Sequence, residues 1–308
     1  MTQHLRDRLG RFGIWRSFTQ VTPDLAAGVE RLGYGTVWLG GSPDGDLEIV
    51  SELLGATTTL MVGTSIVNIW KDDAATVARS YARIEASHPG RFVLGVGAGH
   101  REVIKAYASP YTQLATYVDR LQASAVPAGG LVLAALGPKV LRLASDRTAG
   151  AIPYLVPPEH TRLARVILGP DRLLAPEHKA VLDPDPERGR ALGRKRVENP
   201  YLHLVNYTSN LRRLGFTDED LAGGGSDRLI DALVAHGRPE QVAARLSAHL
   251  DAGADHVAVQ LLTEKTTLTA SGGPSGEPEY AGRTKLTVRS TEPRVGPPVG
   301  PTSEAWVQ

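Results

Sequence analysis

The chain has 308 residues, of which 42% are hydrophobic and 22% charged, and its formal net charge is +1 at pH 7. These are the values of an ordinary globular protein, and the near-neutral charge offers no field for nucleic acid or an anionic membrane. Because the sequence contains no cysteine, disulfides, thiolate nucleophiles and cysteine metal sites are excluded. The composition therefore favours chemistry on small molecules.

No targeting segment is recognisable at the N-terminus. The first residues, MTQHLRDRLGRFGIW, lack the apolar core of a signal peptide, and no uncharged apolar run approaches roughly 18 residues. We therefore expect a cytoplasmic protein that acts on a small-molecule substrate and has neither membrane nor nucleic-acid partners. A homodimer remains open.

Short apolar, β-branched runs alternate with helical patterns along the chain. This alternation is typical of parallel β/α units. A helix is predicted from Pro23 to Gly33 and another from about Asp73 to Ser87, whereas the stretch 186–253 reads as wholly helical. Eight strands are predicted, at residues 12–15, 36–39, 60–69, 91–97, 131–136, 149–156, 173–183 and 256–262. This order predicts an α/β fold of the (β/α)8 TIM-barrel type with a helical insertion before the last strand.

The character of the sequence changes after Glu264. Residues 265–308 are rich in Gly, Pro, Ser and Thr and show no apolar periodicity, which predicts a disordered C-terminal tail. The barrel domain is therefore expected to span residues 1–264. A closing helix after the eighth strand is missing from the pattern.

In a barrel of this kind the active site lies on the loops that follow the strands. Gly97 and Gly99 in GVGAGH let the backbone approach a ligand, although such clusters are as often tight turns. Gly137-Pro138-Lys139 at a helix start suits a phosphate or carboxylate, unless Pro138 merely begins the helix. His100 could carry a proton near neutral pH, or be structural.

Other polar and aromatic residues read as structural. Trp38 and Trp70 are expected to pack, although Trp70 could form the wall of a pocket. The carboxylates of Glu30, Glu48 and Glu85 fall on predicted helices and read as solvated surface.

Several barrel chemistries are disfavoured by what the strand ends lack. No His, Asp and Glu cluster gathers there, so no metal site is predicted. The sixth strand, AIPYLV, has no lysine for a Schiff base, and no paired acids suggest a glycosidase. A glycine-rich, weakly polar mouth suits a large cofactor that brings its own reactivity.

Seven motifs in fixed order carry a resemblance that covers most of the chain. They are VWLGGSP, MVGTSIVNIW, HPGRFVLGVGAGH, LAALGPKVLRLA, AIPYLVPPEHT, NYTSNLRRLGF and GADHVAVQLL. In this order they resemble the bacterial luciferase-like monooxygenase superfamily, most closely its actinobacterial branch that uses the deazaflavin coenzyme F-420.

The resemblance implies that the cofactor ring lies across the barrel mouth. A bulge in the third strand at Ser65-Ile66, often with a non-proline cis peptide in this superfamily, would support the ring. The remaining expected contacts follow residue by residue. Asn68, Gly97, Gly99 and His100 would border the ring or its side chain, Leu136, Gly137, Pro138 and Lys139 would face the phosphate, and Tyr154 and Val156 would line the adjoining wall.

The resemblance further implies an oxidoreductase that transfers hydride between coenzyme F-420 and a small organic substrate, with His100 as the expected proton donor. Relatives acting on sugar phosphates carry a histidine near Ser42, and His100 stands where some relatives use a glutamate, so the acceptor is left open. Two alternatives remain. One is an FMN-dependent monooxygenase of the same barrel, and the other is a barrel that binds a cofactor or ligand without turnover.

Overall fold

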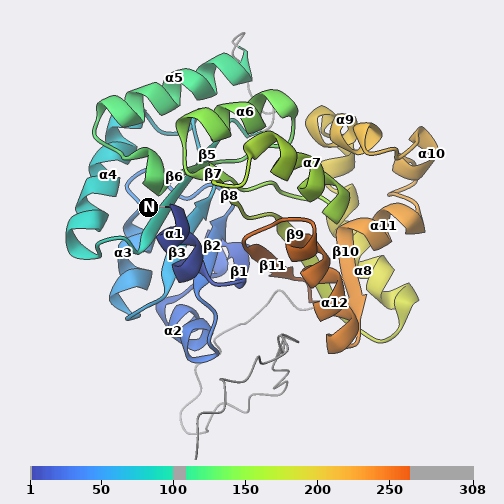
Figure 1. The fold of residues 1–308 in the computed structure, drawn as a ribbon. Helices are drawn as coiled ribbons and strands as arrows, with labels where there is room; N and C mark the ends of the chain where they lie inside the picture. The colour runs from blue at the N-terminus through green and yellow to red at the C-terminus, as the bar shows by residue number, and fades with distance from the viewer. Residues whose placement is uncertain (1, 100–108, 264–308) are drawn as a thin grey trace, which may run out of the picture.

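The computed structural model describes residues 2–99 and 109–263 (Figure 1). His100 and the predicted tail at 265–308 lie outside the described residues. Every strand pairing within the described chain is parallel. The strands are β1 (Phe12–Ser17), β2 (Thr36–Gly40), β3 (Met61–Ser65), β4 (Val67–Asn68), β5 (Phe92–Gly97), β6 (Leu131–Leu133), β7 (Gly150–Ala151), β8 (Leu173–Leu174), β9 (Glu177–Leu182), β10 (Val234–Gly237) and β11 (Val257–Leu261).

The sheet closes on itself. Its strand order is β10-β9-β11-β1-β2-β3-β5-β6-β7-β8, with β4 paired to β5. β8 and β9 stand near opposite ends of this order but are separated in the chain only by Ala175 and Pro176. They form one interrupted strand that pairs with β7 on one side and β11 on the other. The predicted (β/α)8 barrel is therefore confirmed.

Helices surround the strands, as Figure 1 shows. Most are crossovers that return the chain to the base of the next strand, which parallel pairing requires. Between β9 and β10 the chain instead makes an excursion of four helices, α8 to α11. The helices are α1 (Thr2–Leu9), α2 (Pro23–Arg31), α3 (Glu48–Gly55), α4 (Ala74–Ser87), α5 (Pro110–Ala123), α6 (Pro138–Arg147), α7 (Pro158–Leu168), α8 (Pro186–Glu198), α9 (Val205–Arg213), α10 (Asp218–Leu221), α11 (Asp227–Leu233) and α12 (Pro239–Asp251).

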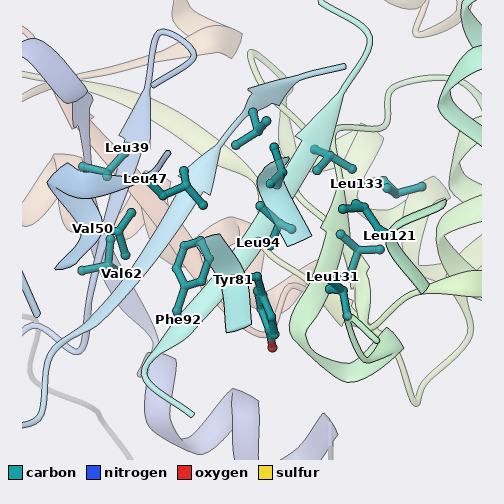
Figure 2. Packing of buried hydrophobic residues seen from close by; sticks show 14 of the residues in the cluster. Leu39, Leu47, Val50, Val62, Tyr81, Phe92, Leu94, Leu121, Leu131 and Leu133 are labelled. Atoms are coloured by element: carbon teal, nitrogen blue, oxygen red, sulfur yellow. The ribbon is translucent and has the colours of Figure 1, made fainter. Parts of the chain in front are cut away.

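The strands are buried on both faces, which explains their continuous apolar runs. Leu39, Val62 and Leu94 belong to the outer layer beneath the helices, where Figure 2 shows them packed with Leu47 and Tyr81. Alternate residues of the same strands fill the barrel interior with a second cluster. Each such side chain contributes about 1.5 to 3 kcal/mol by leaving water.

α1, which the sequence patterns did not predict, lies against the base of the barrel. Leu5 and Leu9 belong to the interior cluster. Arg6 donates to the carbonyl of Arg172 at 2.9 Å and forms an ion pair with Asp255 at 3.2 Å. The base of the barrel is thereby packed.

Several strand predictions differ from the structure. The third strand is interrupted at Ile66, between β3 and β4, and the sixth shortens to Gly150–Ala151 because the chain then turns outward to Tyr154. The prediction that residues 186–253 are wholly helical is wrong, because Val234–Gly237 forms β10. Its four residues follow α11 without a turn signal, so their periodicity resembled the end of that helix.

The carboxylate of Glu30 is not solvated surface as predicted. It accepts hydrogen bonds from the backbone N–H groups of Thr59 and Leu60 at 2.6 and 2.8 Å. Burial raises the pKa of Glu30, but these bonds outweigh it and lower the pKa to about 2. Glu30 therefore anchors the segment that leads into β3.

Candidate active site

A cavity of about 1460 Å³ opens at the carboxyl ends of the barrel strands. This is the end at which barrel enzymes place their active sites. Its volume exceeds that of an ordinary drug-sized pocket. Seven of the residues predicted for the cofactor site lie on its wall: Ser65, Ile66, Asn68, Gly99, Leu136, Gly137 and Tyr154.

The peptide bond between Ser65 and Ile66 is cis, as the resemblance implied. The bond lies at the break between β3 and β4, and both of its residues face the cavity. Trp15 of β1 donates from its indole Nε1 to Ser65 Oγ at 3.0 Å. This hydrogen bond connects β1 to the end of β3 at the cavity.

Gly97 and Gly99 have different roles. Gly97 does not line the cavity, and a Cβ there would lie 2.9 Å from the Cβ of Ala134 and 3.3 Å from Ile66. Gly97 therefore lets β5 pass close to the cis peptide. Gly99 lines the cavity with a φ of +62°, and a Cβ there would lie 2.8 Å from Asn68 Nδ2.

The loop before α6 leaves open space at Gly137, where a Cβ would meet only Arg213, at 3.8 Å. Gly137 is the N-cap of α6, so unpaired backbone N–H groups lie nearby. Pro138 and Lys139 are exposed on the first turn and do not line the cavity. The cation that the structure places nearest to Gly137 is thus Arg213 of α9, which the sequence patterns did not identify.

His160 of α7 fixes the same loop from below. Its Nε2 lies 2.9 Å from the carbonyl oxygen of Leu136 and must donate to it. Burial lowers the pKa of His160, which keeps the ring neutral and leaves Nδ1 without a hydrogen. The Leu136 carbonyl is therefore held away from the cavity, and the residues after it can face inward.

An aromatic wall, defined here as Trp15, Tyr154, Tyr201 and Tyr207, lines the side of the cavity next to α8. The rings of Trp15 and Tyr154 are 5.2 Å apart, and those of Tyr201 and Tyr207 are 5.0 Å apart. The Tyr201 hydroxyl donates to that of Tyr154 at 3.0 Å, and Tyr154 donates to Gln260 Oε1 at 2.9 Å. Burial raises the pKa of Tyr154 well above its usual value, so the phenol stays protonated.

Sequence reasoning found only Tyr154 in this wall. The other members come from β1 and from the excursion between β9 and β10, and no local motif joins them. Val156, predicted beside Tyr154, is buried at 1% exposure and does not line the cavity. Its carbonyl instead faces Nδ1 of His178, 3.4 Å away.

Among the described residues, the two tryptophans outside the aromatic wall lie as the sequence suggested. Trp38 is buried inside the barrel, where its Nε1 donates to His256 at 2.9 Å. Trp70 lines the cavity and donates to the carbonyl of Ala98 at 2.8 Å. Ser42 also lies on the cavity wall.

The cavity wall is positively charged. Among the described residues that line it, five are Lys or Arg and none is Asp or Glu: Arg16, Lys71, Arg188, Lys195 and Arg196. In residues 2–99 and 109–263 no group of His, Asp or Glu is placed to hold a metal ion, and no helix is both long and apolar enough to cross a membrane. The site is suited to an organic anion.

Comparisons with known proteins agree with this geometry. The family model "Luciferase-like monooxygenase" matches residues 20–125. No sequence among the curated proteins matches the chain.

Solved structures share the fold over most of the chain. An F420-dependent secondary alcohol dehydrogenase in complex with an F420-acetone adduct is 15% identical with a TM-score of 0.64, covering 82% of this chain and 93% of that one. The coenzyme F420-dependent tetrahydromethanopterin reductase of Methanopyrus kandleri is 15% identical, with a TM-score of 0.63 and coverage of 82% and 92%.

An FMN complex has a similar fold. It is the oxygenating constituent of 3,6-diketocamphane monooxygenase from Pseudomonas putida, a type II Baeyer-Villiger monooxygenase. It is 13% identical, with a TM-score of 0.57 and coverage of 82% and 92%. The chain thus has the luciferase-like barrel fold, and its resemblance to the luciferase-like monooxygenase family is confirmed by the match over residues 20–125.

Proposed function

We propose that the chain is an oxidoreductase that binds the deazaflavin coenzyme F-420 at the barrel mouth and exchanges hydride between it and a small organic substrate. The observation that carries this proposal is the large cavity at the carboxyl ends of the strands, whose wall includes Ser65, Ile66 and Asn68 and the loops that contain Gly99 and Gly137.

The residues present fit such a cofactor. Ser65, Ile66 and Asn68 form a surface on which a planar ring can lie, and Gly99 leaves room beside Asn68. Gly137 leaves the space of a missing side chain next to the guanidinium of Arg213. Arg213 donates a hydrogen bond to Asn210 Oδ1 at 3.1 Å. The Nδ2 atom of the same Asn210 side chain is buried and has no partner among the described residues.

Arg213 and the backbone N–H groups at the start of α6 would hold the cofactor phosphate. Lys139 remains part of this proposal as a second cation on the first turn of α6, although it does not line the cavity. Pro138 begins that helix. His160 keeps the loop in place through the Leu136 carbonyl.

When bound, the deazaflavin supplies or accepts the hydride. The protein must hold the substrate against the ring, exclude water and move one proton. The aromatic wall provides the apolar surface for the substrate. His100, which lies outside the described residues, remains our candidate for the proton, and His100→Ala should retain cofactor binding while slowing substrate reduction.

FMN is the second candidate cofactor, because the same cradle would accept its phosphate and a structure of similar fold is an FMN complex. The chain would then be a monooxygenase supplied with reduced flavin by a partner reductase.

Titration of the purified protein with coenzyme F-420 and with FMN, followed by absorbance and tryptophan fluorescence, tests the proposal. Trp15 and Trp70 line the cavity, so a bound chromophore should quench their emission. We expect coenzyme F-420 to bind at micromolar concentrations and Arg213→Gln to weaken it. If neither cofactor binds, the proposed redox function is rejected. If only FMN binds, the FMN-dependent monooxygenase becomes the favoured function in place of the F-420-dependent oxidoreductase.

A further inference from the structure

The cavity surface of α8 is basic. Leu192, Lys195 and Asn199 follow one another at helical spacing and all line the cavity, together with Arg196. Lys195 and Arg196 are exposed, and within the described chain neither forms an ion pair. An unpaired cation beside a cavity is available to a ligand.

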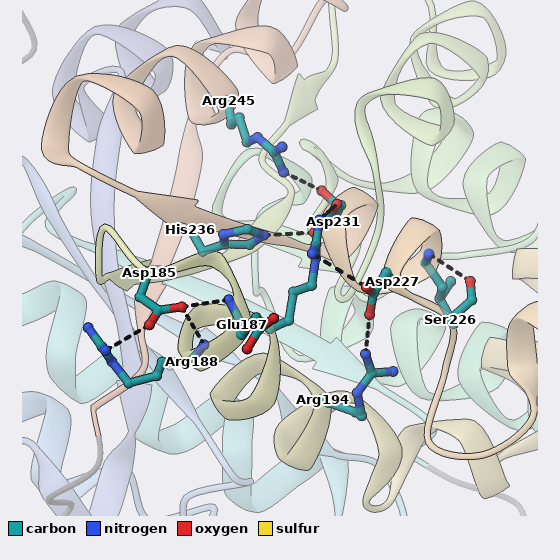
Figure 3. A network of polar contacts seen from close by, with 11 residues as sticks. Asp185, Glu187, Arg188, Arg194, Ser226, Asp227, Asp231, His236 and Arg245 are labelled. Atoms are coloured by element: carbon teal, nitrogen blue, oxygen red, sulfur yellow. Dashed lines mark hydrogen bonds and ion pairs between the residues drawn. The ribbon is translucent and has the colours of Figure 1, made fainter.

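The opposite surface of α8 is fixed to α11. Arg190 bonds the carboxylate of Asp231 at 2.7 Å, and Arg194 bonds Asp227 at 2.5 Å. Figure 3 shows the pair of Arg194 with Asp227, and Asp231 held by His236. The carboxylates of Asp227 and Asp231 are thus paired with Arg194 and Arg190, and no ion pair joins them to Lys195 or Arg196 within the described chain.

Other cations on the cavity wall differ in their pairing. Lys71 is neutralised by Asp44 at 2.6 Å, and Arg188 by Asp183 at 2.8 Å. On α8, the cavity-lining cations without an ion pair in the described chain are therefore Lys195 and Arg196. They stand on α8, whereas the proposed phosphate cradle is built from α6 and α9.

The aromatic wall adjoins this basic surface. Tyr201 follows α8 after Asn199 and Pro200, and burial raises the pKa of its phenol, a shift that the charge of Arg196 opposes. Tyr207 packs against Tyr201 edge to face, with an interplanar angle of 73°. Aromatic faces and a carboxylate-binding pair thus lie next to each other on one side of the cavity.

We infer that the organic substrate of this site is a planar aromatic carboxylate. Its ring packs against Tyr201 and Tyr207, and its carboxylate is bound by Lys195 and Arg196. This inference rests on the proposed function for what the site does with the substrate, but the binding itself needs no cofactor.

A matched pair of probes, 2-naphthoate and the uncharged 2-naphthamide, isolates the role of the charge. Isothermal titration calorimetry on the full chain should show the carboxylate binding about tenfold more tightly than the amide, with an advantage that falls as salt is added. Equal affinities for the two probes would overturn the inference.

Variants of α8 identify the cations. Lys195→Gln and Arg196→Gln, singly and together, should reduce the affinity for 2-naphthoate, by about tenfold in the double variant, and leave 2-naphthamide unchanged. Arg194→Gln removes the same charge from the position next to Lys195, but there the side chain pairs with Asp227 of α11, and the change should alter neither affinity. An equal loss in Arg194→Gln would mean that only net charge matters and would overturn the assignment.

The glutamate carboxylates of coenzyme F-420 are the other anion that could reach α8. Titration of the double variant with coenzyme F-420 and with its phosphate-free chromophore shows whether Lys195 and Arg196 bind the carboxylates of the cofactor or that of the substrate. A loss of coenzyme F-420 binding with unchanged 2-naphthoate binding would assign the cations to the cofactor and overturn the inference. Absence of all cofactor binding, with the naphthoate preference intact, would support the anion site while rejecting the proposed redox function.

Discussion

The carboxylate of Glu177 and the ammonium of Lys179 lie 3.1 Å apart inside the barrel, where the two residues are 2% and 0% exposed. Burial raises the pKa of Glu177 and lowers that of Lys179, and the charge of each residue opposes the shift of the other. Lys179 Nζ also lies 4.1 Å from the centroid of the Tyr154 ring, and Glu177 accepts the N–H of Leu155 at 3.0 Å. The pair therefore supports the loop that carries the aromatic wall.

Replacing Lys179 with Met should reduce the free energy of unfolding by about 3 to 5 kcal/mol, because it leaves a buried carboxylate unpaired. The double variant Glu177→Gln/Lys179→Met should recover more than half of that loss, since Gln keeps an oxygen for Leu155. Urea denaturation of the single and double variants measures both effects. Additive losses in the double variant would show that the two groups do not stabilise each other.

The buried pair also shows where sequence reasoning reached its limit. Charged residues at 177–179 are not expected inside a strand that is buried on both faces, because polar residues normally mark a solvated edge. Inside a barrel, alternate residues share the interior, so Glu177 and Lys179 neutralise each other while His178 points to the opposite side and approaches His249 at 2.9 Å. Such compensation depends on partners that no local pattern displays.

The residues of the proposed cofactor site that lie at strand ends could be predicted more readily from the sequence. Gly99 and Gly137 were identified because each lies in a motif next to a strand, and the barrel brings such loops together, whereas Ser65 came from the family resemblance. Trp15 and Tyr201 were missed because they reach the cavity only through tertiary packing, and Arg213 was missed because its approach to Gly137 depends on how α9 packs. The excursion helices α8 to α11 could be predicted as helical, but their orientation against the cavity depends on pairs such as Arg194 with Asp227.

The depressed pKa of Glu30 predicts a pH-dependent contribution to stability. A carboxylate with a folded pKa of about 2 stabilises the protein above its unfolded value of 4.5, and this contribution is lost as the pH falls toward 2. Glu30→Gln should therefore cost about 1 kcal/mol at neutral pH, and its difference from wild type should shrink through that window. Urea midpoints recorded at neutral pH and near pH 3 measure the change.

Glu48→Gln is the control for this experiment. Glu48 is an exposed helical carboxylate whose contact is a surface ion pair with Arg83 at 3.0 Å. Its replacement should change stability by only a few tenths of a kcal/mol. If Glu30→Gln behaves in the same way, the backbone bonds of Glu30 contribute little.

Replacing Arg16 should stabilise the protein, in contrast to the variants above. It lines the cavity from β1, and its buried Nε has no acceptor among the described residues. A buried donor without a partner costs about 1 to 3 kcal/mol. Arg16→Met should therefore raise the midpoint of thermal unfolding of the ligand-free protein, as expected where a residue serves binding rather than folding.

Arg31→Met removes an equal charge from an exposed position on α2 and should leave the thermal midpoint nearly unchanged. A lower midpoint for Arg16→Met than for Arg31→Met would show that the guanidinium stabilises the barrel.

Gly99 and Gly169 offer a matched test of the cofactor site. Both have positive φ, +62° and +77°, so alanine strains the backbone at each, and more strongly at Gly169, whose ψ of 174° lies in a region that is essentially restricted to glycine. At Gly169 a Cβ meets nothing within 4 Å, whereas at Gly99 it lies 2.8 Å from Asn68 Nδ2. Because Asn68 also accepts the N–H of Trp70 at 3.0 Å, the clash at Gly99 should displace two residues of the cavity wall. We expect both variants to lose stability, Gly169→Ala at least as much as Gly99→Ala, but the binding of coenzyme F-420 or FMN to weaken only in Gly99→Ala. Equal cofactor affinities would remove Gly99 and Asn68 from the proposed site.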